Sequence, residues 1–206
     1  WIDGGGERTG LPDRISEFDH KRGTYWRWLR CVIGGDRVDA ANDRRSLRIE
    51  YRPIPTQPSV TDVVGTQALV AGGLRGLVEA DHPIAQLPWS AAESSFYNAA
   101  EDGLDAELAW VTADGERTSD SEVVFGEIFD HARSGLEAAG VPADDIDQYL
   151  SPIEGRWDAR TTPSTWKKAR VRDALEEGAD LSGAIAAMQR EYIARSREGD
   201  AFVSWL

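Results

Sequence analysis

The 206-residue sequence is short of cysteine, of lysine and of long apolar runs. Its single cysteine, Cys31, excludes an internal disulfide framework and fits a reducing compartment. The richest apolar stretch, residues 63–78, is interrupted by four glycines, so neither a membrane span nor a membrane partner is expected. The chain begins Trp-Ile-Asp-Gly-Gly-Gly, with neither an initiator methionine nor a signal-peptide pattern. We therefore expect a cytoplasmic chain that starts within a longer protein or has lost its beginning.

Positive charge is scarce in this sequence. Thirty-six acidic residues face 23 basic ones, the net charge is −13, and only three of the bases are lysines. Such a surface repels itself in dilute buffer, but at molar salt the screening length falls to about 3 Å. This composition favours a halophilic protein over an ordinary acidic protein from an arginine-rich genome. Nucleic acid is not expected as a partner, because no basic stripe could neutralise its phosphates.

Strand patterns are confined to residues 1–55, and residues 56–206 are expected to be mainly helical. Residues 24–33 are rich in β-branched and aromatic side chains and end at Gly34-Gly35. Residues 46–52 alternate between apolar and charged side chains, as a strand does. Prolines at 53, 55 and 58 then exclude both ladder and helix. The predicted fold is α+β: an antiparallel sheet fragment followed by a helical layer.

Helix patterns fill most of the remaining sequence. A helix over residues 61–80, capped by Ser59 or Thr61, presents Ala68, Gly72 and Gly76 four residues apart, which predicts close approach of another backbone. Capping boxes at 90–93 and 119–122 predict two more helices, which should end at Gly103 and Gly140. A strand at 106–112 and a turn at 114–115 are expected between them. The last helices are expected at 164–177 and 180–197. Apolar faces are predicted at Val63, Val70, Leu74, Leu77 and Val78; at Phe125, Phe129, Ala132, Leu136 and Ala139; and at Leu181, Ile185, Met188 and Tyr192.

The most promising chemistry lies on the strand of residues 46–52. Arg48, Glu50 and Arg52 alternate along it and should share one face, with Leu47, Ile49 and Tyr51 on the other. A carboxylate flanked by two guanidinium groups can hold Mg²⁺ and phosphate oxygens. A solvent-facing ladder of salt bridges is common on antiparallel sheets, and the spacing alone favours this explanation.

Motifs along the chain resemble the glutamate–cysteine ligase-like carboxylate–amine ligases of the glutamine synthetase superfamily. The strand Leu-Arg-Ile-Glu-Tyr-Arg, a proline-broken loop and a Gly- and Ala-rich helix are similar to their Arg-x-Glu-x-Arg strand and following helix. Residues 22–30 are similar to a Gly-Thr-x-Trp-Arg-Trp-Asn-Arg segment, and residues 95–108 to a helix-to-strand Gly-Leu-Asp-Ala signature. Residues 160–166 and the last two helices also resemble the family. The resemblance covers what would be its C-terminal half, so residues 1–206 are expected to form part of one catalytic domain.

The resemblance implies a reaction in which ATP phosphorylates a carboxylate and an amine displaces the phosphate. The implied substrates are glutamate and cysteine, joined for glutathione biosynthesis. It implies Mg²⁺ and ATP as cofactors, Glu50 as metal ligand, and Arg48 and Arg52 as catalytic and nucleotide-binding residues. Arg30 and Arg27 are further nucleotide-binding candidates. Arg160 is a substrate-binding candidate from the same resemblance.

The expected partners are amino acids, ATP, an N-terminal half that supplies the family's glutamate cluster, and a homo-oligomer. Alone, the chain is expected to be inactive. The alternative function is a helical binding or assembly module without catalysis. The three histidines lack ligand spacing and are expected at the surface.

Overall fold

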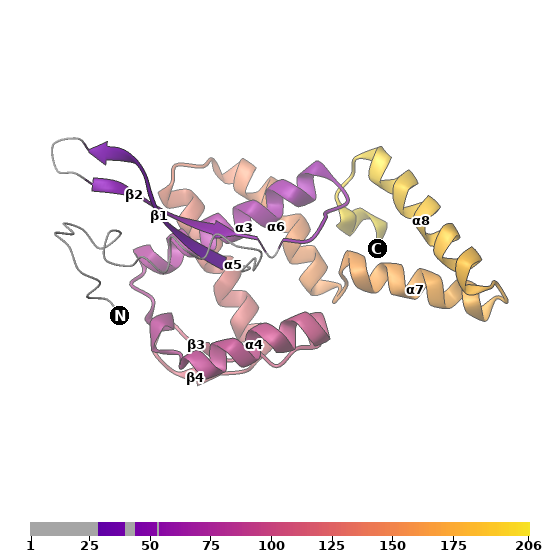
Figure 1. Ribbon diagram of the computed structural model, residues 1–206, viewed down its shortest axis with the longest axis horizontal. Helices are drawn as coiled ribbons and strands as arrows, with labels where there is room; N and C mark the ends of the chain where they lie inside the picture. Colours follow the sequence, from indigo (N-terminus) through magenta and orange to yellow (C-terminus); the bar gives the residue numbers. More distant parts are fainter. Residues whose placement is uncertain (1–28, 40–43, 53) are drawn as a thin grey trace, which may run out of the picture. The chain divides into compact units, whose positions relative to one another are not determined.

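The computed structural model of the chain describes residues 29–39, 44–52 and 54–206, with the backbone alone for 29–39 and 44–47 (Figure 1). The chain divides into two compact units, Trp1–Pro55 and Thr56–Leu206. The boundary coincides with the predicted change from strand-rich to helical sequence, and membership of both units in one catalytic domain stays a prediction. The described residues are mostly helical and include a small antiparallel sheet, which is compatible with the predicted α+β class.

In the described part of the first unit, β1 (Leu29–Asp39) and β2 (Arg44–Tyr51) form an antiparallel pair. The ladder pairs Arg30 with Glu50 and Val32 with Arg48, and its register shifts between Ile33 and Arg37. The predicted end of β1 at Gly34-Gly35 is wrong, because the strand continues to Asp39. The two glycines lie in the irregular stretch, where glycine commonly accompanies a β-bulge. Residues 24–28 of the predicted strand lie outside the described residues.

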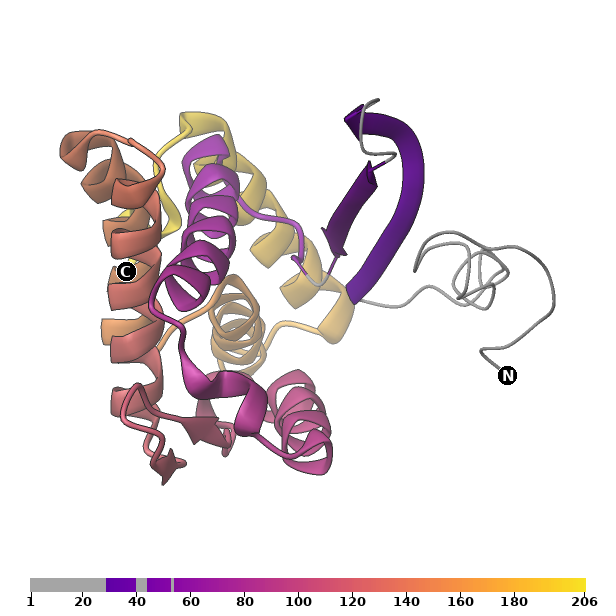
Figure 2. The ribbon, with the colours of Figure 1, turned by 90° about the vertical axis from the view of Figure 1, so that its left-hand side faces the viewer.

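The second unit is built around α3 (Val60–Glu79), which lies against α5 (Ser121–Ala138) and α6 (Ala143–Asp158) (Figures 1 and 2). Ser59 caps α3 by accepting a hydrogen bond from the Asp62 N–H. A Cβ added at Gly72 would lie 2.5 Å from the carbonyl oxygen of Ala132 on α5. At Gly76 an added Cβ would overlap the carbonyl of His131. The predicted close approach of a second backbone to this small-residue face is therefore confirmed.

The predicted apolar stripe of α3 is wrong in part. Val63, Leu74 and Val78 are exposed, whereas the glycine face is buried. At Gly72 and Gly76 the backbone of α5 is too near to leave room for a larger side chain, so glycines occupy the closest contact.

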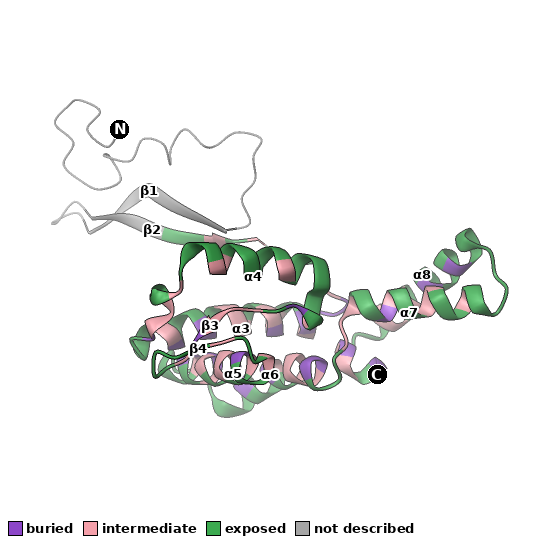
Figure 3. Cartoon of the chain, turned by 90° about the horizontal axis from the view of Figure 1, so that it is seen from below, coloured by how far each residue is buried: buried purple, intermediate pink, exposed green. Residues whose placement is uncertain are grey.

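Helix α4 (Trp89–Asp102) follows a short 3₁₀ helix, η1 (Pro83–Gln86), and contains no buried residue (Figure 3). The helix ends at Gly103, as predicted, but the capping box at residues 90–93 is wrong. Pro88 occupies the N-cap position, so Ser90 already lies in the first turn. A second 3₁₀ helix, η2 (Gly103–Asp105), leads to the hairpin.

The strand predicted at 106–112 is shorter in the structure, where β3 (Trp110–Val111) pairs with β4 (Arg117–Thr118). The turn between them uses Gly115 at φ 85°, in the left-handed region that favours glycine. The capping box at 119–122 is also wrong, since Asp120 caps α5 by accepting from the Glu122 N–H. The predicted apolar face of α5 is largely correct: Phe129 and Ala132 are buried, and Phe125 and Leu136 are partly buried.

Helix α6 was not predicted. Proline inside a helix is unfavourable, and Pro152 lies inside α6. Nevertheless α6 buries Ile146, Leu150 and Trp157. Tertiary packing therefore outweighs the unfavourable proline.

The chain ends in the helical pair α7 (Pro163–Glu176) and α8 (Leu181–Glu198) and a short 3₁₀ helix, η3 (Phe202–Trp205). These elements share a core of Trp166, Met188, Phe202 and Trp205. On α8, Met188 is buried but Leu181 and Ile185 are exposed, contrary to the predicted face.

A buried ion pair ties the end of the chain to α3. The Asp62 carboxylate, which is completely buried, pairs with Arg156 at 2.5 Å and accepts the N–H of Phe202 at 3.1 Å. Within the described part of the chain, none of the helices is both long and apolar enough to cross a membrane.

Candidate functional site

The charged side chains of the Arg-Glu-Arg strand, Arg48, Glu50 and Arg52, come together at the end of β2, with Arg52 one residue beyond the strand. The Glu50 carboxylate lies 2.5 Å from Arg52 Nη2 and 3.5 Å from Arg48 Nη2. Glu50 and Arg52 are partly buried, and Arg48 is 60% exposed. Both guanidinium groups thus converge on one carboxylate.

The opposite face of β2 does not match the prediction. Ile49 is 58% exposed and Tyr51 43% exposed, although both were expected to be buried. A pair of strands has no hydrophobic core of its own, which accounts for the exposure. The side chain of Leu47 lies outside the described residues.

Of the two further nucleotide-binding candidates, Arg30 and Arg27, the structure describes only the backbone of Arg30. Arg30 lies on β1 at the register position of Glu50, so the ladder brings the two backbones side by side. Its side chain is outside the described residues, and so is the whole of Arg27. Their predicted roles in nucleotide binding stay predictions.

Arg160 lies just after α6, with φ at 48° in the left-handed region. Its guanidinium lies 3.4 Å from the ring centroid of Trp157 and forms an ion pair with Glu122 at the start of α5. These contacts connect the ends of two helices. Its predicted contact with a substrate stays a prediction.

A second group of ionisable side chains lies in the helical unit, where sequence reasoning expected only surface histidines. The His82 side chain is completely buried, which contradicts that expectation. Its Nε2 lies 3.4 Å from Glu127 Oε2, and its ring packs edge-on against that of His131 with 4.9 Å between centroids. The ligand atoms of His82, Glu127 and His131 all lie within 4.8 Å of one another.

The Glu127 carboxylate is held by groups from the β3–β4 hairpin. Its Oε2 accepts a hydrogen bond from Trp110 Nε1 at 2.7 Å, and its Oε1 accepts the Ala113 N–H at 3.1 Å. Burial raises the pKa of Glu127, but the hydrogen bonds from Trp110, Ala113 and His82 outweigh it, so the pKa lies below its ordinary value. Glu127 is therefore ionised at neutral pH.

One sequence signal could have identified part of this group. Glu127 and His131 are four residues apart in a predicted helix, a spacing that places both on one face. His82 could not be added from the sequence, because it is 45 residues from Glu127 and follows a different helix.

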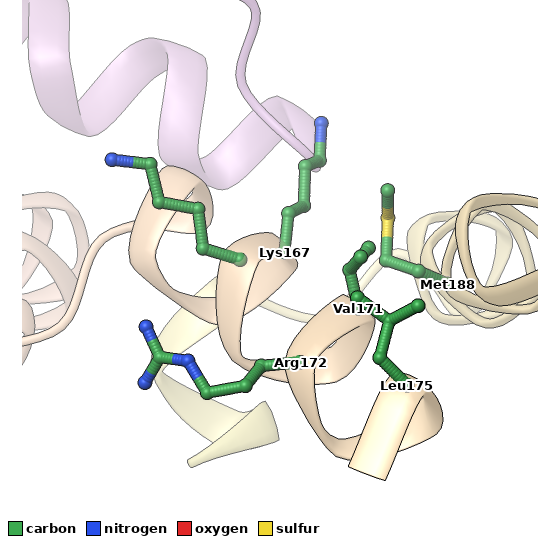
Figure 4. A pocket seen from close by; sticks show the side chains of 6 residues that line it. Lys167, Val171, Arg172, Leu175 and Met188 are labelled. Atoms are coloured by element: carbon green, nitrogen blue, oxygen red, sulfur yellow. The ribbon is translucent and has the colours of Figure 1, made fainter. Parts of the chain in front are cut away.

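A shallow hollow of about 420 Å³ lies between α7 and α8 (Figure 4). Val171, Leu175 and Met188 gather on one side of it, while the charged end of Arg172 points away from them. None of the predicted site residues lines this hollow.

Comparisons of the chain with protein-family models, with curated proteins and with solved structures gave no match.

Proposed function

We propose that the chain is part of an ATP- and Mg²⁺-dependent carboxylate–amine ligase with a glutamine synthetase-like catalytic domain. Its substrates are proposed to be an amino-acid carboxylate and an amine, with glutamate and cysteine as the leading pair. The observation that supports this function best is the convergence of Arg48 and Arg52 on Glu50 across one strand face.

The cluster suits phosphoryl transfer because a phosphate group can replace Glu50 as the partner of Arg48 and Arg52 with little loss of free energy. Partly exposed pairs of this kind contribute only about 0–1 kcal/mol. When ATP arrives, its phosphate oxygens compete for the two guanidinium groups, which form planar, bidentate hydrogen bonds to phosphate. The carboxylate of Glu50 would then offer an oxygen ligand to Mg²⁺.

The simple salt ladder remains the competing explanation of the strand. A ladder would pair each arginine with an acid on the neighbouring strand. Arg48 and Arg52 both form ion pairs with Glu50, two residues away along the chain, which supports a local charge cluster. The side chains of β1, with which a ladder would form, lie outside the described residues.

The test is ATP binding by the chain, measured by equilibrium dialysis with and without Mg²⁺. Glu50→Gln should remove the Mg²⁺-dependent part of the affinity, and Arg52→Met should weaken ATP binding under both conditions. Glu79→Gln is the matched control, since Glu79 forms a 3.0 Å pair with Arg75 on an exposed helix face. Equal Mg²⁺-dependent binding by wild type and Glu50→Gln contradicts the proposal.

A second candidate function, a non-catalytic binding module, is favoured by the surface of α4. This helix exposes Trp89, Phe96 and Tyr97 and buries none of its residues. If α4 serves association, the chain should self-associate in sedimentation experiments, and replacing Trp89 and Tyr97 by serine should abolish this. A monomeric chain that binds Mg²⁺ and ATP excludes this second candidate.

A further inference from the structure

The group of His82, Glu127 and His131 joins two parts of the helical unit that are distant in sequence. His82 lies between α3 and η1, whereas Glu127 and His131 lie one turn apart on α5. The α3–α5 packing through Gly76, whose backbone lies against His131, brings these elements together. The group belongs to the helical unit and does not include any residue of the Arg-Glu-Arg strand.

The chemistry of the group matches a transition metal ion better than Mg²⁺. Two imidazole nitrogens and one carboxylate oxygen are ligands that Zn²⁺ and related divalent ions accept, whereas Mg²⁺ prefers oxygen ligands throughout. Three protein ligands leave one tetrahedral position for water or another small ligand. The Glu127 side chain is 22% exposed, so solvent reaches the group.

The distances need only a small adjustment. Ligand atoms about 2.0–2.1 Å from a tetrahedral ion lie about 3.3 Å from each other. The separation of His82 Nε2 and Glu127 Oε2, 3.4 Å, already agrees with this. The widest separation in the group is at most 4.8 Å, and the partly exposed ring of His131 can rotate to shorten it.

The carboxylate already has the support that metal ligands require. Trp110 Nε1 and the Ala113 N–H donate to the two oxygens of Glu127 and fix its orientation. Outer hydrogen bonds of this kind orient the ligands of protein metal sites. The hairpin β3–β4 would therefore act as the supporting layer of the site.

Metal binding would move the proton of the His82 ring from one ring nitrogen to the other. Its Nδ1 accepts the Ile84 N–H at 3.2 Å, so the neutral ring carries its proton on Nε2, facing Glu127. A metal ion at Nε2 requires the other neutral tautomer, in which the proton lies on Nδ1. Binding therefore breaks the hydrogen bond that the Ile84 N–H donates to Nδ1.

We propose that His82, Glu127 and His131 form a binding site for one divalent transition metal ion of the Zn²⁺ class. The site is independent of the proposed ATP site, because it shares no residue with β2. In a metal-free protein, the same contacts act as a polar connection between α5, η1 and the β3–β4 hairpin.

The experiment is a Zn²⁺ titration of the metal-free 206-residue chain in competition with a chromophoric chelator, repeated with Co²⁺ to record its visible absorption. The expected result is one ion per chain. His131→Ala should lower the affinity by at least about 100-fold, and Trp110→Phe, which removes one outer hydrogen bond, by about 10- to 100-fold. His131→Ala avoids the hydrogen-bonded carboxylate, and its melting temperature without metal shows whether the fold is intact. Glu137→Ala, an exposed change on the same helix, should bind like wild type.

Two results would overturn the metal site. One is the absence of Zn²⁺ binding by the folded wild-type chain. The other is equal affinity in wild type and in folded His131→Ala, which would place the ion elsewhere. Either result leaves the group as a metal-free polar connection and has no bearing on ATP binding by β2.

Discussion

Replacing Gly76 by alanine tests how closely α3 and α5 approach. In an ordinary helix interior this change stabilises by about 1 kcal/mol, because alanine restricts the unfolded chain and favours the helix. At Gly76 the new methyl group would overlap the His131 carbonyl, which is backbone and cannot rotate away. Forced overpacking costs about 1–3 kcal/mol, and contact with backbone favours the upper end. The expected net loss is about 2 kcal/mol, or about 4–8 °C in melting temperature for a chain of this size.

Gly73 provides the matched control for this prediction. It lies on the same helix, and an added Cβ there meets no atom within 4 Å among the described residues. Gly73→Ala should therefore stabilise by about 1 kcal/mol. Urea unfolding followed by circular dichroism measures both variants. If Gly76→Ala is as stable as Gly73→Ala, the backbones do not lie in contact and the account of the α3–α5 interface is refuted.

Three further predictions concern charge. Asp62→Ala should cost about 3–5 kcal/mol in urea unfolding because it leaves Arg156 buried without its partner, and a loss below 1 kcal/mol contradicts the buried pair. Burial raises the pKa of Tyr192 above its ordinary value of 10.0; nearby Asp62 adds to the increase and Arg156 opposes it. The folded chain therefore holds this proton more tightly than the unfolded chain, and the associated stability is present below pH 10 and lost as the pH rises through the folded pKa. Tyr192→Phe should reduce this loss of stability at alkaline pH. A melting temperature whose pH dependence is the same in the variant and in wild type contradicts the raised pKa of Tyr192. Finally, a net charge of −13 should make the melting temperature fall as salt is diluted from molar to millimolar, and a flat salt profile argues against halophilic adaptation.

The sequence predicted those parts of the fold that depend on local spacing. The four-residue interval of Gly72 and Gly76 identified a helix face made for backbone contact, and the alternation around Glu50 identified a strand with one charged face. Both signals are periodic and need no knowledge of distant residues. Helix ends at Gly103 and Gly140 were also predictable, because each requires a backbone conformation that glycine adopts readily.

Other features depend on packing that the sequence does not express. Helix α6 was not predicted because Pro152 disfavours a helix. The contacts that stabilise α6 come from residues that are distant in the sequence. The N-cap of α5 was misplaced because Ser119 and Asp120 are adjacent and compete for the same role. The N-cap of α4 was misplaced because it is Pro88, which has no capping side chain. His82 was assigned to the surface because only the tertiary fold brings it to Glu127.

The central claim is that the strand of Arg48, Glu50 and Arg52 serves an ATP-dependent ligase. The most direct measurement is phosphate release at saturating ATP and Mg²⁺ with glutamate and cysteine, by the chain joined to the glutamate-bearing half that the resemblance implies. The account predicts turnover in that protein and none from the 206-residue chain alone. It also predicts that Glu50→Gln abolishes turnover with little change in melting temperature, because a partly exposed ion pair contributes about 0–1 kcal/mol to folding. Near-normal phosphate release by Glu50→Gln, with Glu79→Gln as control, would contradict the claim and leave the strand as a salt-bridged surface.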